Sequence, residues 1–194
     1  MSDDADLLER AAGGDHTAFG ALVRRHTPRM YRVALRITGC AAEAEDVVQD
    51  SWLAAWRSLA GFRQEAAVST WLYRVVTNSA LALLRRRRPT ISLDAPDPAS
   101  TLDSPSLAVP GPEGRVVRAE EVDAVLRAIG RLEVSQRVPL VLRELEGLSY
   151  EEVAEVLDVN VVALRSRLHR ARSALLAELA RSRTTSCGVT PRTR

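Results

Sequence analysis

A proline-rich segment near the middle of the sequence divides the chain into two parts. Residues Pro89–Gly114 contain six of the nine prolines together with several Ser and Asp residues, and they contain no basic side chain. A segment of this composition has too few apolar side chains to form a packed core. We therefore expect a flexible acidic linker over residues 89–117, between a domain at 1–88 and a second domain at 118–181. The polar residues 182–194 are expected to form a disordered tail.

The composition outside this segment favours helices. Ala, Leu, Arg and Glu, which are good helix formers, dominate there, and only 4% of all residues are aromatic. A chain of 194 residues is long enough for two domains of roughly 80 residues each. The sequence therefore predicts an all-α fold made of two small helical domains.

The stretch Gly147–Leu179 has the pattern of two helices joined by a short turn at Asp158–Asn160. Ser149 and Glu152, three residues apart, form a capping-box pattern at the start of the first helix. The apolar residues at helical spacing are Val153, Val156 and Leu157 in the first helix and Leu164, Leu168, Ala171, Leu175 and Leu179 in the second. This pattern predicts a helix-turn-helix in the second domain.

The second of these helices is basic outside its apolar stripe. It carries Arg165, Arg167, Arg170 and Arg172, and no acidic residue follows the turn before Glu178. An arginine can bind phosphate oxygens, or O6 and N7 of guanine, through two parallel hydrogen bonds, so the pattern suits the major groove of DNA. An ordinary helical hairpin with a solvated basic surface is the alternative interpretation.

In the first domain, two helices are expected before residue 40. The first contains Leu7, Leu8 and Ala11 and ends at Gly13-Gly14, and Asp15 or Thr17 can cap the second. The second helix is expected to be interrupted or kinked at Pro28 before it continues to Gly39.

A third helix is expected over residues 42–59, with acidic residues crowded into its first half. Acids in the first turn, such as Glu43 and Asp46, stabilise a helix through its dipole. Gln49 and Asp50 lie a turn later, where the helix dipole does not explain their presence. A protein-binding surface is therefore an equal alternative for this face.

The last helix of the first domain has two different sides. Leu72, Val75, Val76, Ser79 and Leu83 have the spacing of a core-facing stripe, with Thr70 as a candidate N-cap. The opposite side carries Trp71, Arg74, Asn78, Leu81 and Arg85, and the helix ends in four consecutive arginines, residues 85–88. An aromatic ring, an amide and cations together suit an unpaired base and its phosphates. A Trp packed under a neighbouring loop, followed by a solvated helix end, is the alternative.

Residues suited to catalysis or metal binding are scattered. His16, His26 and His169 lie far apart, as do Cys40 and Cys187, and no Gly-rich phosphate loop occurs. We expect no enzyme activity, no metal and no cofactor. The net charge of only +2 means that nucleic-acid binding must come from local patches. Because no apolar run reaches the ~20 residues of a membrane span and the N-terminus is acidic, we expect a cytoplasmic protein without membrane insertion.

Three segments, taken in order, resemble an RNA polymerase sigma factor of the extracytoplasmic-function (ECF) type. They are AEAEDVVQDSWLAAW, with its core at 44–56, FRQEAAVSTWLYRVVTNSALALLRRRR at 62–88, and LRELEGLSYEEVAEVLDVNVVALRSRLHRAR at 142–172. The resemblance covers nearly the whole chain apart from the linker and the tail. It implies a transcription initiation factor that binds core polymerase, directs it to promoters and promotes DNA melting.

The resemblance also implies partners and site residues. The residues matching those that bind core polymerase, at the clamp of its largest subunit, are Asp46, Gln49, Asp50 and Trp56. Those matching the residues that bind single-stranded DNA of the −10 element are Phe62, Trp71, Tyr73, Arg74, Asn78 and Arg85. Those matching the residues that bind duplex DNA of the −35 element are Arg165, Ser166, Arg167, His169 and Arg170. The polymerase flap and an anti-sigma factor are further implied partners.

The chain departs from the family's pattern at two places. Asn160, Val161, Val162 and Ala163 stand where the family usually has Pro-x-Gly-Thr, and Gln64 stands where a Gly often follows Phe-Arg. The first change removes a close backbone approach and a hydroxyl donor at a helix N-terminus, where a phosphate would bind. The base preferences at both promoter elements therefore stay open.

Two other functions remain as alternatives. One is a free-standing helix-turn-helix regulator that binds duplex DNA as a dimer, which would need neither the acidic third helix nor the Trp71 face. The other is an adaptor controlled by an anti-sigma factor that has lost promoter binding through the changes at 160–163.

Overall fold

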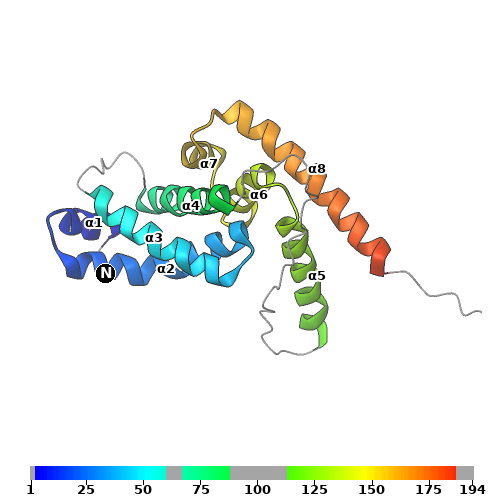
Figure 1. The fold of residues 1–194 in the computed structure, drawn as a ribbon, viewed down its shortest axis with the longest axis horizontal. Coiled ribbons are helices and arrows are strands. Elements are labelled where there is room, and N and C mark those ends of the chain that lie inside the picture. The colour runs from blue at the N-terminus through cyan, green and yellow to red at the C-terminus, as the bar shows by residue number, and fades with distance from the viewer. Residues whose placement is uncertain (1–2, 60–66, 88–112, 187–194) are drawn as a thin grey trace, which may run out of the picture.

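The structure is a computed structural model and describes residues 3–59, 67–87 and 113–186. Every regular element in these ranges is a helix, which confirms the all-α class (Figure 1). The first domain contains α1 (Asp4–Ala12), α2 (His16–Thr38), α3 (Ala41–Ser58) and α4 (Val68–Arg87). The second contains α5 (Glu113–Gly130), α6 (Val134–Leu140), the π-helix η2 (Val141–Leu145), α7 (Tyr150–Leu157) and α8 (Val161–Ser186). No helix in the described ranges is both long enough and apolar enough to span a membrane.

Local hydrogen bonds set the ends of α2. Asp15 caps it, because its Oδ1 accepts hydrogen bonds from the backbone N–H groups of Thr17 at 2.9 Å and Ala18 at 3.0 Å. Gly39 ends it in the left-handed conformation, with φ of 75°. The helix continues through Pro28 and is not interrupted there. Helix α2 is thus long enough to contact all the other helices of the first domain.

The first domain is a bundle in which α2, α3 and α4 pack against one another. Its largest fully buried side chains are Leu8, Leu22, Met30, Val33, Ile37, Val47 and Val76. Helix α4 begins at Val68, so the prediction that Thr70 caps it is wrong. Thr70 lies in the first turn, where its hydroxyl contacts Oε1 of Glu152 in the second domain at 3.4 Å. The short sequence window around Thr70 contains no sign of that distant partner.

The second domain is built around the contact between α6 and α8, and α5 and α7 also pack against α8. Pro139 lies inside α6, and the helix widens into the π-helix η2 directly after it. Two boundaries differ from the prediction: α5 begins at Glu113, inside the expected linker, and α8 continues to Ser186, past the expected start of the tail. Once a helix exists, each added residue gains a backbone hydrogen bond at little cost, so it extends into polar sequence.

The two domains share a continuous apolar core. Buried residues of α2 and α4 belong to the same cluster as buried residues of the second domain, among them Val138, Leu142, Val153, Leu164 and Leu168. Helix α4 contacts α7, and α2 contacts α5, α6 and η2. Figure 1 shows α7 above α4 and α8 running away from the first domain. The chain between the domains, residues 88–112, lies outside the described residues.

Candidate functional site

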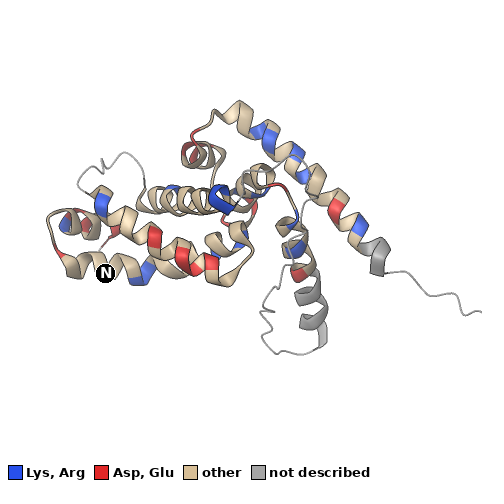
Figure 2. Ribbon diagram, in the orientation of Figure 1, with Lys and Arg blue, Asp and Glu red and all other residues tan. Residues whose placement is uncertain are grey.

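Helix α8 presents a basic, solvent-exposed face (Figure 2). The exposed residues on it are Arg165, Ser166, Arg167, His169, Arg170 and Arg172. The other side of the helix is fixed in the core by Leu164, Leu168 and Ala171, each fully buried. The structure therefore brings the residues assigned to the −35 element together on one rigid helix. Arginine side chains held this way can bind base edges or phosphates.

Caps fix both ends of α7 and the start of α8. Ser149 and Glu152 form the predicted capping box: Ser149 Oγ accepts from the N–H of Glu152 at 3.1 Å, and Glu152 Oε2 accepts from the N–H of Ser149 at 2.7 Å. Asp158 ends α7 with a φ of 52°, in the left-handed region. Asn160 then caps α8, since its Oδ1 accepts from the N–H of Ala163 at 2.7 Å. The unusual residue Asn160 is thus a working helix cap.

Tyr150, the first residue of α7, is surrounded by three guanidinium groups. Arg143 lies over its ring at 4.8 Å and Arg165 at 5.6 Å, measured to the ring centroid. Nη2 of Arg172 lies 3.4 Å from the Tyr150 hydroxyl and 2.6 Å from Oε1 of Glu144. The hydrogen bond from Arg172 lowers the pKa of the Tyr150 hydroxyl. Our sequence reasoning did not identify Tyr150, because only the fold brings residues 143, 150 and 165 together.

Helix α4 presents a second basic face. Arg74, Asn78 and Arg85 are exposed, and Nε of Arg85 donates to the carbonyl of Leu81 at 3.3 Å. Trp71 is partly buried and packs against the core of the first domain, so only part of its ring is open to solvent. The core contact shows that Trp71 has a packing role, and its contact with an unpaired base stays a prediction. Phe62, also assigned to the −10 element, lies outside the described residues.

Tyr73 is separated from the exposed residues of α4. Its side chain is buried, and its hydroxyl donates a hydrogen bond to Oε2 of Glu146 at 2.9 Å. Burial, followed by the nearby Glu146 carboxylate, raises the pKa of the Tyr73 hydroxyl, which keeps it a donor. Arg29 lies over the ring at 5.2 Å from its centroid. In this arrangement the second domain covers Tyr73.

Glu146 connects the second domain to three residues of the first. Its side chain is only 3% exposed. Arg36 donates to its Oε1, and Nε of Arg29 lies 3.6 Å from its Oε2, which also accepts from Tyr73. A buried carboxylate needs such partners, because charge is costly to remove from water. Glu146 is a second residue that the sequence patterns did not reveal.

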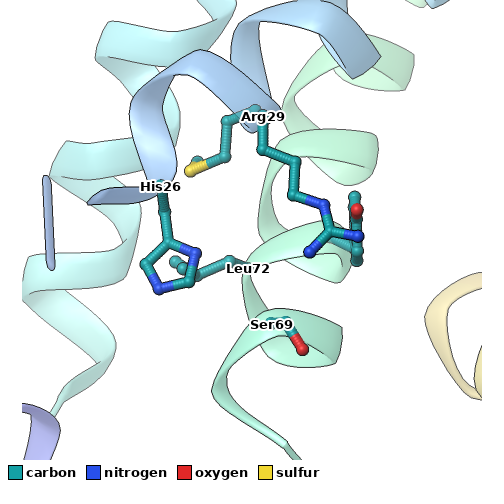
Figure 3. Close-up of a pocket in the computed structure, with 6 residues that line it drawn as sticks. His26, Arg29, Ser69 and Leu72 are labelled. Carbon is teal, nitrogen blue, oxygen red and sulfur yellow. The ribbon is translucent and has the colours of Figure 1, made fainter. Parts of the chain in front are cut away.

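A narrow pocket lies beside this contact, between α2 and α4 (Figure 3). His26 and Arg29 of α2 line one side, and Ser69 and Leu72 of α4 line the other. Nε2 of His26 is 2.9 Å from Oδ2 of Asp4, which ties the histidine to α1. The pocket has room for about one water molecule and cannot hold a nucleobase.

Helix α3 presents an acidic face with an apolar neighbour (Figure 2). Asp46, Gln49 and Asp50 are exposed at helical spacing, and Leu53, one turn further on, is 49% exposed. Trp56 has a different environment, because its ring stacks on His16 at 5.0 Å and meets Phe19 at 4.8 Å between centroids. The structure brings the three polar residues together and shows that Trp56 mainly packs against α2.

The comparisons with known proteins cover both domains. Residues 22–90 match the Sigma-70 region 2 family, and residues 123–175 match the Sigma-70 region 4 family. The ECF RNA polymerase sigma-E factor of Salmonella typhimurium is 37% identical over 176 residues, which are 89% of this chain and 92% of that protein. The chain belongs to the ECF sigma factors. Such proteins are transcription initiation factors. The region 2 match contains α3 and α4, and the region 4 match contains the basic face of α8.

Two solved structures share the fold of this sigma factor. CnrH, in complex with the cytosolic domain of CnrY, has a TM-score of 0.65 and 29% identity, over 91% of this chain and 97% of that one. RpoE from Bartonella quintana, in a co-crystal with the anti-sigma factor NepR, has a TM-score of 0.61, over 84% of this chain and 96% of that one. At 24% identity the second likeness concerns the fold alone.

Proposed function

We propose that this sigma factor uses three separate faces in initiation. The acidic face of α3 binds the clamp of core RNA polymerase, the α4 face binds unpaired DNA of the −10 element, and the α8 face binds duplex DNA of the −35 element. The observation that carries the proposal is the exposed row of basic and polar side chains on α8, in the second helix of a capped helix-turn-helix. The recognition helix of such a motif lies in the major groove.

The α4 face has a different chemistry, which supports a different DNA form. It combines part of an indole ring, the exposed amide of Asn78 and the cations of Arg74 and Arg85. Stacking on an aromatic ring is available to a base only after it leaves the duplex, and each stacked base contributes roughly 1–3 kcal/mol. Unpairing costs a few kcal/mol, so such contacts can offset it. The protein itself makes and breaks no covalent bond in this role.

The α3 face supports the polymerase contact. Asp46, Gln49 and Asp50 are exposed, and the partly exposed Leu53 extends the surface with an apolar patch. A mixed surface of this kind suits a basic or polar protein partner. Trp56 contributes by holding α3 against α2. We propose that the protein acts in the cytoplasm, where the polymerase works, and that the polymerase flap contacts the second domain.

Charge reversal tests the polymerase contact. We expect Asp46→Arg combined with Asp50→Arg to lose co-purification with core polymerase while thermal unfolding stays close to wild type, because both side chains are exposed. Glu45→Arg combined with Ala54→Arg, also at exposed positions of α3, is the matched control. Unchanged co-purification of the first variant would remove α3 from the proposal.

We further propose that an anti-sigma factor holds this protein in the arrangement seen here. Glu146 and its partners tie the second domain over Tyr73, one of the proposed −10 residues. Two proteins with the same fold, CnrH and the Bartonella RpoE, form complexes with CnrY and NepR respectively. A pull-down from uninduced native cells that recovers polymerase subunits alone would contradict a dedicated regulator.

Run-off transcription tests the proposed function as a whole. Core polymerase with the purified protein is given a library of randomised promoters, and we expect transcripts only from templates that share two short elements. Core polymerase alone is the control. Binding of the free protein to duplex sites without any polymerase-dependent transcript would favour a helix-turn-helix regulator.

A further inference from the structure

One apolar side chain stands out at the start of the α8 face. Val162 is 73% exposed, more than any other large hydrophobic residue among the side chains that the structure describes. It lies in the first turn of α8, and Ser166, one turn later, donates from its hydroxyl to the Val162 carbonyl at 3.3 Å. The Val162 side chain does not contribute to the core, because Leu164, on the opposite side of α8, is the residue of this turn that is buried there.

The backbone around Val162 is fixed. Asn160 caps the turn through the N–H of Ala163 at 2.7 Å, and Val161 packs against the core of the molecule. Valine in a helix has essentially one side-chain rotamer, so its two methyl groups point in a defined direction. Val162 is therefore a small apolar side chain with a fixed orientation, next to Arg165 on the α8 face.

The surroundings of Val162 indicate its partner. Arg165 and Ser166 follow at three and four residues, so they lie on the same side of the helix, and both are exposed. In a helix-turn-helix, the N-terminal residues of the recognition helix are the ones that contact base edges. The one apolar group that B-DNA offers in the major groove is the C5-methyl group of thymine.

We propose that Val162 contacts the C5-methyl group of a thymine in the −35 element and so determines specificity at that base pair. The inference rests on the proposed role of α8 in −35 binding. The proposal also gives a function to residues 160–163, where the chain departs from the family's pattern. Asn160 supplies the helix cap. Val162, which stands where the family usually has a glycine, adds an apolar contact with a base.

Deoxyuridine tests this contact, because it lacks only the methyl group of thymine. Holoenzyme is assembled from core polymerase and the full chain, and the −35 sequence that it prefers is selected from randomised duplexes. Each thymine on both strands of that sequence is then replaced in turn by deoxyuridine. We expect one replacement to weaken wild-type binding about fourfold, the effect of one buried methyl group. Val162→Ala should bind the thymine duplex about fourfold more weakly and lose all sensitivity to that replacement.

The controls separate this inference from the role of α8. Leu176→Ala removes another exposed apolar side chain from the same helix, 68% exposed, and should keep the wild-type response to deoxyuridine. Arg165→Ala should weaken binding about five- to 150-fold on both duplexes if Arg165 contacts a base. Two results overturn the Val162 contact alone when Arg165→Ala still loses binding. One is that no replacement of thymine by deoxyuridine weakens wild-type binding, and the other is that Val162→Ala stays sensitive to the replacement. Unchanged binding in a double Arg165→Ala, Arg170→Ala variant, together with a flat deoxyuridine scan, overturns the assignment of α8 and the Val162 contact with it.

Discussion

On α8, the side chains assigned to the −35 element are exposed along the helix, whereas on α4 one member of the −10 set, Tyr73, is buried against Glu146 of the second domain. The two proposed DNA-binding faces therefore differ in what must happen before they work. The α8 face can meet duplex DNA in the arrangement described here. With Tyr73 assigned to the −10 element as proposed, the α4 face becomes complete only when the domains separate. A protein built this way can find a duplex site in one state and bind unpaired DNA in another.

The contacts between the domains explain how such a state is held. Arg137 of α6 donates to the carbonyl of Ile37 at 2.7 Å, and Glu146 binds Arg36 and Tyr73. Apolar side chains add to these contacts, because buried residues of the two domains form one cluster. Apolar burial stabilises the contact but does not depend on a particular orientation of the two domains. The buried carboxylate of Glu146 favours one orientation, because it needs its partners on the first domain.

The largest expected effect comes from removing Glu146. Glu146→Ala leaves Arg36 and the Tyr73 hydroxyl without their carboxylate partner, which should destabilise the closed arrangement by about 3 kcal/mol. We expect small-angle scattering to report a larger radius of gyration and the free protein to bind a single-stranded −10 oligonucleotide more tightly. Glu144→Ala, two residues away, loses only an exposed ion pair with Arg172 and should stay closed. An equally compact Glu146→Ala protein with unchanged oligonucleotide binding would mean that Glu146 does not hold the domains together.

A smaller effect is expected on α8. Arg170→Ala should weaken binding to the −35 duplex by about 1–3 kcal/mol with relaxed specificity at one base pair if the contact is bidentate to a base. If the contact is to a phosphate, the loss should be uniform over sequences and the salt dependence should fall by about one counterion. Competition binding over a panel of duplexes at several salt concentrations distinguishes the two. A double Arg165→Ala, Arg170→Ala variant that binds and transcribes normally would remove α8 from promoter recognition.

The smallest effect concerns Tyr150. Its ring lies under Arg165, and a cation–π contact at an exposed site contributes about 0.5–1 kcal/mol. Tyr150→Leu should therefore weaken duplex binding by about that amount, while Tyr150→Phe, which keeps the ring, should bind like wild type. The loss should vanish when Arg165 is already replaced by alanine. An additive loss in the double variant would show that Tyr150 acts on DNA by another route.

The sequence predicted features that depend on neighbouring residues. The Asp15 cap and the Ser149 and Glu152 capping box each involve groups within three residues, so their patterns are visible in a short window. The apolar stripe of α8 was predicted for the same reason, and Leu164 and Leu168 are buried as expected.

Contacts between distant residues account for what the sequence did not predict. Tyr73 meets Glu146 across 73 positions, and Thr70 meets Glu152 across 82, so neither local spacing nor helical periodicity indicates them. The same holds for Tyr150, whose arginine partners come from two other helices. The assignment of residues to DNA and polymerase likewise came from resemblance to a family.

Permanganate reactivity of unpaired thymines tests most directly whether the α4 face melts DNA while the α8 face binds duplex DNA. Asn78→Ala is the cleaner variant because Asn78 is exposed, and Trp71→Ala accompanies it with a check of thermal unfolding, since Trp71 also packs against the core. We expect both holoenzymes to bind a duplex promoter nearly as well as wild type, to show weak permanganate reactivity at the −10 element, and to recover on a template with a pre-melted bubble. Full reactivity with both variants, or loss of duplex binding that the bubble does not rescue, would contradict a melting role for the α4 face.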